Sequence, residues 1–119
     1  MARAQPPEDI APLDFFTRWV PAAVAGDEER RRKLGATDAR IVFDLLGEGG
    51  GAYTLRVEEG RISGAEGRSE APDLVVSLDV PTWRALNRGE LSAPEALLRR
   101  RVKLQGDFLL GLKLHLILG

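Results

Sequence analysis

The sequence predicts one α+β domain, in which helices cover a sheet of about five mainly antiparallel strands. Its 119 residues suffice for one hydrophobic core but leave little to spare. Short runs are rich in β-branched and aromatic residues, and the connections between them are too short for crossover helices. Segments with helical spacing of apolar residues flank these runs. We expect residues 1–11 to form a flexible N-terminal arm and residues 12–119 to form the domain.

The first helix is predicted to follow the arm directly. The arm cannot form regular backbone hydrogen bonds, because it contains or adjoins three prolines, Pro6, Pro7 and Pro12. From Leu13 onward apolar residues recur on one helical face, and Gly26 ends the pattern. The members of that face are Phe15, Phe16, Trp19, Val20 and Ala23.

A short second helix is predicted over residues 28–34. Asp27 is a favourable N-cap, and Gly35 is a favourable residue just after the helix. The charges from Glu28 to Lys33 are of mixed sign at helical spacing, which favours a solvated face with ion pairs between residues four apart. A contact with an anionic membrane is the alternative for this charged run.

The strands are predicted from branched and aromatic residues. Residues 39–46 and 53–58 form the first two, and the second alternates cleanly between apolar and polar side chains. The glycine cluster Gly47–Gly51 joins them and allows the positive φ angles of a hairpin turn. The cluster lacks the Lys-Ser/Thr pair of a phosphate-binding loop. Further strands are expected over 61–66, 73–80 and 102–105.

Three helix starts are predicted in the C-terminal half. Pro81 begins a short helix that ends near Gly89. Ser92 with Glu95 three residues later fits a capping box at the start of the next helix. Asp107 caps a last helix that runs to about residue 118.

The last helix carries more apolar surface than one packed face requires. One stripe contains Phe108, Leu109, Leu112 and Leu116. A second stripe on the far side contains Leu110, Leu114 and Ile117. Three kinds of contact could bury these stripes: the protein's own core, a bound apolar molecule, or a partner subunit.

Composition argues against several functions. The net charge of −1 does not fit a nucleic-acid-binding protein. Cysteine is absent and His115 is the only histidine, so we expect no metal site, no cofactor and no catalytic residue. No secretory signal and no run of apolar residues long enough to span a bilayer is visible, which predicts a cytoplasmic location.

Several segments, in this order and spacing, resemble the sterol carrier protein 2 (SCP2) family of lipid-binding domains. The resemblance covers about residues 36–118 and rests on the segments Ala39–Leu45, Tyr53–Val57 with Gly60, Asp73–Leu78, Trp83–Leu91, Pro94–Ala96, Val102–Asp107 and Leu112–Leu114. Where family members often carry a glycine just before the last strand, this chain has Arg99, Arg100 and Arg101.

The resemblance implies a five-stranded, mainly antiparallel sheet backed by helices, with an apolar tunnel between them for a fatty acid, acyl-CoA or sterol. It implies neither a catalytic residue nor a metal. Residues expected to line the tunnel are Phe15, Trp19, Phe43, Trp83, Leu86, Leu98, Phe108, Leu109, Leu112 and Leu116. Residues expected to contact a lipid head group are Arg99, Arg100 and Arg101.

Two functions are therefore compared. The first is non-catalytic binding or transfer of an apolar ligand, with transient membrane contact. The second is an interaction module with the same fold, which forms a homodimer through the C-terminal helix or acts within a larger assembly such as lipid or quinone biosynthesis.

Overall fold

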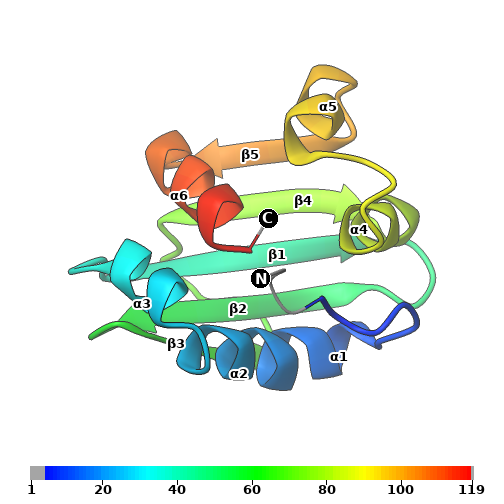
Figure 1. The fold of residues 1–119 in the computed structure, drawn as a ribbon. Coiled ribbons are helices and arrows are strands. Elements are labelled where there is room, and N and C mark those ends of the chain that lie inside the picture. The colour runs from blue at the N-terminus through cyan, green and yellow to red at the C-terminus, as the bar shows by residue number, and fades with distance from the viewer. Residues whose placement is uncertain (1–4, 119) are drawn as a thin grey trace.

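The computed structural model describes residues 5–118, which form one five-stranded sheet with helices on one of its faces (Figure 1). The strands are β1 (Ala39–Leu46), β2 (Gly51–Glu58), β3 (Arg61–Glu66), β4 (Leu74–Asp79) and β5 (Val102–Gly106). The helical elements are α1 (Pro12–Asp14), η1 (Phe15–Trp19), α2 (Val20–Ala25), α3 (Glu28–Leu34), α4 (Val80–Asn87), α5 (Ala93–Leu98) and α6 (Phe108–Leu118). The predicted α+β class and five-stranded sheet are confirmed.

The strand order is β3-β2-β1-β4-β5, and one pair in it is parallel. β1 with β2, β2 with β3, and β4 with β5 are antiparallel. β1 and β4 run parallel, with Phe43 opposite Val76. The connection between them contains the β2 and β3 strands instead of a helix, so short connections do not prevent a parallel pair here.

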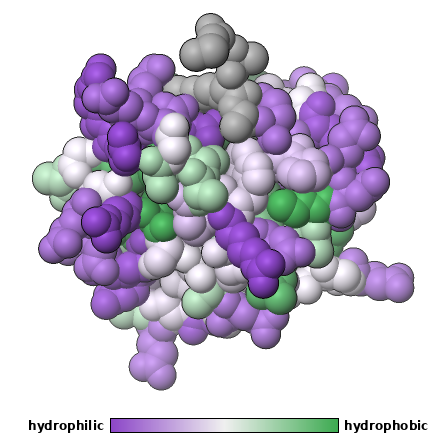
Figure 2. All heavy atoms as spheres, turned by 60° about the horizontal axis from the view of Figure 1, so that its bottom comes forward, coloured by the Kyte–Doolittle hydropathy of each residue, from purple (hydrophilic) through white to green (hydrophobic). Residues whose placement is uncertain are grey.

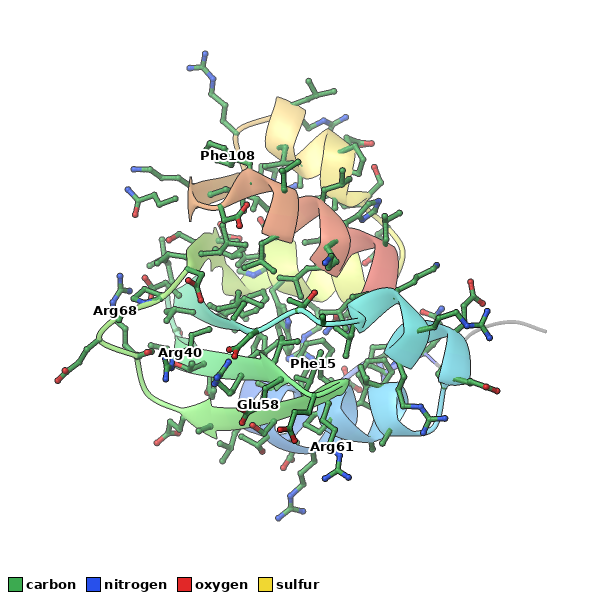
Figure 3. All side chains as sticks on the ribbon, turned by 90° about the vertical axis from the view of Figure 1, so that its left-hand side faces the viewer. Phe15, Arg40, Glu58, Arg61, Arg68 and Phe108 are labelled. Carbon is green, nitrogen blue, oxygen red and sulfur yellow. The ribbon has the colours of Figure 1, made fainter. Side chains whose placement is uncertain are left out.

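The face of the sheet away from the helices is crossed by the loop from residue 67 to residue 73. The Thr54 hydroxyl donates to the Gly67 carbonyl at 2.8 Å and accepts from the Ser69 backbone N–H at 3.0 Å. The Arg68 guanidinium pairs with the Asp44 carboxylate on the same face. Figure 3 shows Arg40 and Arg68 on this side of the molecule, away from α6. The main hydrophobic core lies on the helix side, while Val42 and Val75 are buried on this opposite face.

The first helix is interrupted by a wide turn at η1. The Val20 N–H donates to the Phe15 carbonyl five residues earlier, and the α-helix continues from Val20 through Pro21. The backbone of Phe16 lies directly on β3, since a Cβ atom added at Gly64 would lie 1.9 Å from the Phe16 carbonyl oxygen. This close approach buries Phe15 and Phe16 between the helix and the sheet. The outer surface at the bottom of Figure 1 is largely hydrophilic. Its hydrophobic residues lie in small separate groups (Figure 2).

The prediction of a solvated face on α3 is wrong for Arg30. Asp27 caps the helix as expected, accepting from the Arg30 N–H at 3.1 Å. The Arg30 side chain itself is buried, with 1% of its surface exposed. Its Nε atom lies 3.6 Å from the Asp27 carboxylate, and its guanidinium lies 5.8 Å from the centre of the Trp19 ring. A carboxylate and an aromatic face together compensate the burial of this charge.

Helix α6 presents its second stripe to the core. Leu110, Leu114 and Ile117 are at most 7% exposed, and the Asp107 carboxylate caps the helix by accepting from the Leu110 N–H at 3.2 Å. All four residues of the other stripe are exposed, and only Phe108 and Leu112 of them also line the cavity described below. A partner subunit therefore cannot bind through Leu114, because that side chain is already covered by the chain's own core.

Helix α5 ends in a Schellman motif with arginine at the position that usually holds glycine. The Arg101 N–H donates to the Ala96 carbonyl at 2.8 Å, and the Arg100 N–H donates to the Leu97 carbonyl at 3.1 Å. Arg100 has a φ of 59°, in the left-handed region that favours glycine. The backbone at Arg100 therefore has a conformation that glycine adopts more readily than arginine.

We expect Arg100→Gly to raise the free energy of unfolding by about 1 kcal/mol, because glycine adopts this conformation without steric cost. Urea denaturation measures the change. Arg99→Gly is the matched control, since it removes the same charge at a φ of −84°, and it should lower stability slightly. Equal effects of the two substitutions would contradict a conformational origin.

Candidate ligand-binding cavity

A cavity of about 880 Å³ lies between the sheet and the helices η1, α4, α5 and α6. This volume is near the upper end of the range of about 300–1,000 Å³ found for small-molecule sites. The lining residues include no Asp, Glu, Lys or Arg, and most of them are apolar. The cavity is partly open to solvent.

The floor of the cavity comes from alternate residues of three strands. Phe43 belongs to β1, Val76 and Leu78 to β4, and Val102 and Leu104 to β5. Because successive side chains of a strand point to opposite faces, residues two apart along one strand share the cavity face. The apolar alternation of the sequence thereby places these side chains under the helices.

An aromatic cluster forms the wall at η1 and α4. The Phe15 ring packs edge-on against Trp83 with centroids 5.3 Å apart, and it stacks on Trp19 at 5.5 Å. Phe16 lies 4.9 Å from Phe43 across the floor. Aromatic pairs with this geometry contribute about 0.5–1.5 kcal/mol each beyond their buried area, which favours this arrangement of the wall.

The N-terminal segment lies against α4 beside the cavity. The Arg84 guanidinium donates to the Ile10 carbonyl at 2.5 Å and to the Glu8 carbonyl at 3.3 Å. Arg88 pairs with the Asp9 carboxylate at 3.2 Å. Gln5 of this segment lines the cavity, together with Asn87 and Ser92 from the region around the end of α4. Polar lining side chains therefore lie near α4, and His115 adds another from α6.

The structure brings most of the predicted lining residues to the cavity. These are Phe15, Trp19, Phe43, Trp83, Leu86, Phe108 and Leu112. Their contact with a ligand stays a prediction.

Leu98, Leu109 and Leu116 do not line this cavity. On α5 the neighbouring Leu97 lines the cavity instead, because adjacent helical positions differ in direction by about 100°. Leu109 lies in a separate shallow cleft beside Lys113, and Leu116 is 51% exposed.

The arginines expected to contact a head group do not line the cavity. Arg99, Arg100 and Arg101 lie in the exposed turn between α5 and β5. Arg99 pairs with the Glu95 carboxylate at 3.2 Å. Their predicted contact with a lipid head group therefore needs a ligand that extends beyond the cavity.

Several lining residues were missed by the sequence reasoning. They include Val76, Leu78, Val102 and Leu104 on the strands and Leu118 at the end of α6. The alternating pattern of β4 and β5 is the signal that could have found the strand residues.

The chemistry available in the cavity is binding by apolar contact and a few hydrogen bonds. Within residues 5–118, no group of three or more acidic, histidine or cysteine side chains is placed to hold a metal ion. Tyr53 stacks on Phe16 below the cavity wall, and burial, with a smaller effect of the Glu66 carboxylate, raises the pKa of its phenol. At the start of α4, hydrogen bonds from Thr82 lower the pKa of Asp79, the N-cap.

The fold and the cavity place the chain among small α+β domains with an apolar cavity between sheet and helices. It belongs to the SCP-2 sterol transfer family, whose model matches residues 21–119. No curated protein matches the chain in sequence. Among residues 5–118, no helix has the length and apolar character needed to cross a bilayer.

Solved structures show the same fold at low sequence identity. The sterol carrier protein domain 2 of Helicoverpa armigera is 21% identical, with a TM-score of 0.71, 95% of this chain covered and 89% of that chain. Palmitated SCP2L2 from Aedes aegypti is 19% identical, with a TM-score of 0.66 and coverage of 84% and 87%. A sec-alkylsulfatase from Pseudomonas sp. is 24% identical, with a TM-score of 0.60 and coverage of 75% of this chain. The chain spans only 14% of the length of that sulfatase.

Proposed function

We propose that this protein binds one lipid-like molecule in the cavity without catalysing a reaction. The observation that carries this proposal is a cavity of about 880 Å³ whose lining is mainly aromatic and aliphatic and contains no Asp, Glu, Lys or Arg. Transfer of apolar ligand surface from water into such a site contributes about 25 cal/mol for each Å² buried. Membership of the sterol transfer family and the likeness to a palmitated structure support the same class of ligand.

Lipid that copurifies with the protein tests this function. Protein purified from its native host without detergent is analysed by native mass spectrometry and, after organic extraction, by lipid mass spectrometry. We expect a population heavier by the mass of one lipid, and the same lipid in the extract. Protein of the bare mass, with no uptake from added fatty acid, sterol or acyl-CoA, would contradict the proposal.

The route into the cavity is proposed to pass between α5 and α6. Leu97 of α5 and Phe108 and Leu112 of α6 line the cavity and are at least 44% exposed. Leu98 is 85% exposed and is followed directly by three exposed arginines. Exposed apolar side chains next to arginines are the combination that binds anionic membrane surfaces. We call Leu97, Leu98, Phe108 and Leu112 the cavity lip.

Leu98→Glu is expected to slow lipid transfer between anionic vesicles by about ten-fold, because it removes an apolar anchor and adds a repelled charge. Its affinity for a monomeric fatty acid should not change, since Leu98 does not line the cavity. Vesicle-to-vesicle transfer of a fluorescent lipid measures the rate. Leu46→Glu is the control, because Leu46 is 56% exposed and lies outside the lip and the cavity. Equal rates for the two variants would show that the lip does not contact the membrane.

A second candidate is an interaction module within a larger assembly. Its support is the likeness to a segment that makes up 14% of the sec-alkylsulfatase chain, and the exposed stripe of α6 with Leu109 at 78% and Leu116 at 51%. Light scattering coupled to size-exclusion chromatography tests self-association. A dimer that Leu116→Glu dissociates would favour this candidate, and a monomeric mass of the unaltered protein would contradict self-association.

A further inference from the structure

The N-terminal segment, residues 5–10, borders the cavity without belonging to the sheet or to a helix. Gln5 and Pro6 line the cavity. In Figure 1 the segment is the dark blue stretch that lies between α1 and α4. Within residues 5–118, its one backbone–backbone hydrogen bond joins the Ile10 N–H to the Pro7 carbonyl at 3.2 Å, inside the segment itself. No ladder of backbone hydrogen bonds among the described residues therefore ties the segment to the domain.

Two arginines of α4 hold the segment in place. Arg84 donates to the Ile10 carbonyl at 2.5 Å and to the Glu8 carbonyl at 3.3 Å. Arg88 lies 3.2 Å from the Asp9 carboxylate. The two arginines are four residues apart, so they lie one helical turn apart on the same side of α4. The Asp9 side chain is 94% exposed, and a surface ion pair of this kind adds little stability. Most of the segment is thus fixed by polar contacts that water can replace.

Two further contacts set how the segment can move. Ile10 is half-buried and packs against the hydrophobic core. The Arg84 guanidinium lies 4.8 Å from the centre of the Trp83 ring, and Trp83 lines the cavity, so the position of Arg84 depends on the cavity wall. The Ala11 carbonyl accepts the first backbone hydrogen bond of the following helix at 2.9 Å. Ala11 is therefore the point about which the segment can turn.

A segment held in this way can open locally while the domain stays folded. Regions with few buried apolar contacts and few backbone hydrogen bonds have opening free energies well below that of global unfolding. Pro6 and Pro7 fix two successive φ angles, which limits the conformations of the opened segment and lowers the entropy lost when it closes. The tip of the segment beside the cavity can therefore leave and return as a stiff piece.

We propose that residues 5–10 form a lid on the cavity, which α4 holds closed through Arg84 and Arg88. When these contacts break, the segment turns about Ala11, and Gln5 and Pro6 leave the opening. The lid and the cavity lip of α5 and α6 border one opening from two sides. This inference rests on the proposed lipid binding and adds that the lid sets the rate at which the ligand exchanges.

Exchange kinetics with a fluorescent fatty acid as the probe test the lid. Excess unlabelled fatty acid displaces the bound probe in a stopped-flow fluorimeter, without vesicles, so that membrane contact of the lip does not affect the rate. The double variant Arg84→Gln with Arg88→Gln should release the probe about ten-fold faster than the unaltered protein. Neither arginine lines the cavity, so the variant should still bind one probe per protein.

Arg18→Gln is the matched control for the double variant. It removes an exposed arginine of η1, which pairs with Asp14 at 3.8 Å and does not line the cavity. The release rate should equal that of the unaltered protein.

A cross-link between the lid and α4 should have the opposite effect. The chain contains no cysteine, so Asp9→Cys with Arg88→Cys introduces the only two thiols at the positions of the ion pair. Before cross-linking, this variant should release the probe faster than the unaltered protein, because the ion pair is lost. Joining the two thiols with a short bismaleimide should make release slower than in the unaltered protein. Asp9→Cys alone, treated with the same reagent, should show no such slowing.

The outcomes separate this inference from the proposed function. A double variant that releases the probe at the rate of Arg18→Gln, or a cross-linked protein that releases it as fast as the protein before cross-linking, overturns the lid while lipid binding stands. An unaltered protein that takes up no probe overturns both the lid and the proposed function.

Discussion

Gly64→Ala is expected to lower the free energy of unfolding by about 3 kcal/mol, because the added methyl group enters space held by another backbone. The new Cβ atom would lie 1.9 Å from the Phe16 carbonyl oxygen and 2.7 Å from its carbonyl carbon. Neither atom belongs to a flexible side chain, so η1 must move away from β3. Because η1 supplies Phe15, Phe16 and Trp19 to the cavity, the variant should also bind lipid more weakly.

Urea denaturation followed by circular dichroism measures the stability change. Ser63→Ala is the control on the same strand, since Ser63 is exposed and pairs with Arg56 on the face away from the helices. It should change stability by less than about 0.5 kcal/mol. A loss for Gly64→Ala as small as that of the control would mean that η1 does not pack on β3 as described.

Leu86→Glu is expected to lower the affinity for an apolar ligand by about 100-fold, because the ligand would have to strip water from a carboxylate. Leu86 is half-buried on α4 and lines the cavity. Glutamate keeps the helix propensity high, and in the free protein the half-exposed position leaves its carboxylate access to water, so the fold should persist. Competitive displacement of a fluorescent fatty acid measures the affinity.

Leu13→Glu serves as the matched control for this variant. Leu13 is a helical leucine of 44% exposure that does not line the cavity. Its replacement should leave the affinity unchanged. If both substitutions weaken binding equally, the ligand is not held at α4, and if neither does, the cavity is not the binding site.

Local signals predicted much of the fold. The alternation of Tyr53, Leu55 and Val57 predicted a strand with one buried face, and these residues are buried as expected. Short polar side chains marked the helix starts, because a cap needs only residues within one turn. Asp27 and Asp107 both accept the backbone hydrogen bonds that this rule predicts.

Features set by tertiary packing could not be predicted in this way. The parallel pairing of β1 with β4 joins strands separated by a complete hairpin, and no local pattern encodes it. Helix α6 has apolar residues on both sides, so its sequence does not say which side meets the sheet; the structure buries Leu114 and exposes Leu112. Arg30 is buried by a neighbouring carboxylate and by Trp19, which lies on another helical element.

The candidate site shows the same division. The large aromatic residues of the first helix and α4 could be predicted from the sequence, because large apolar side chains pack into any hydrophobic core. Phe15, Trp19 and Trp83 line the cavity. On the short helix α5 the prediction selected Leu98 where Leu97 lines the cavity. A shift of one residue on a helix changes the direction of a side chain by about 100°, and a helix of this length carries too few apolar residues to define its phase.

Energy transfer from tryptophan to a bound polyene fatty acid tests the central claim most directly. The chain has two tryptophans, and both Trp19 and Trp83 line the cavity. A polyene chain that absorbs at the tryptophan emission should quench both residues and saturate at one ligand per protein, and Leu86→Glu should shift the titration to higher concentration. Unquenched tryptophan emission in the presence of excess polyene fatty acid would contradict lipid binding in this cavity.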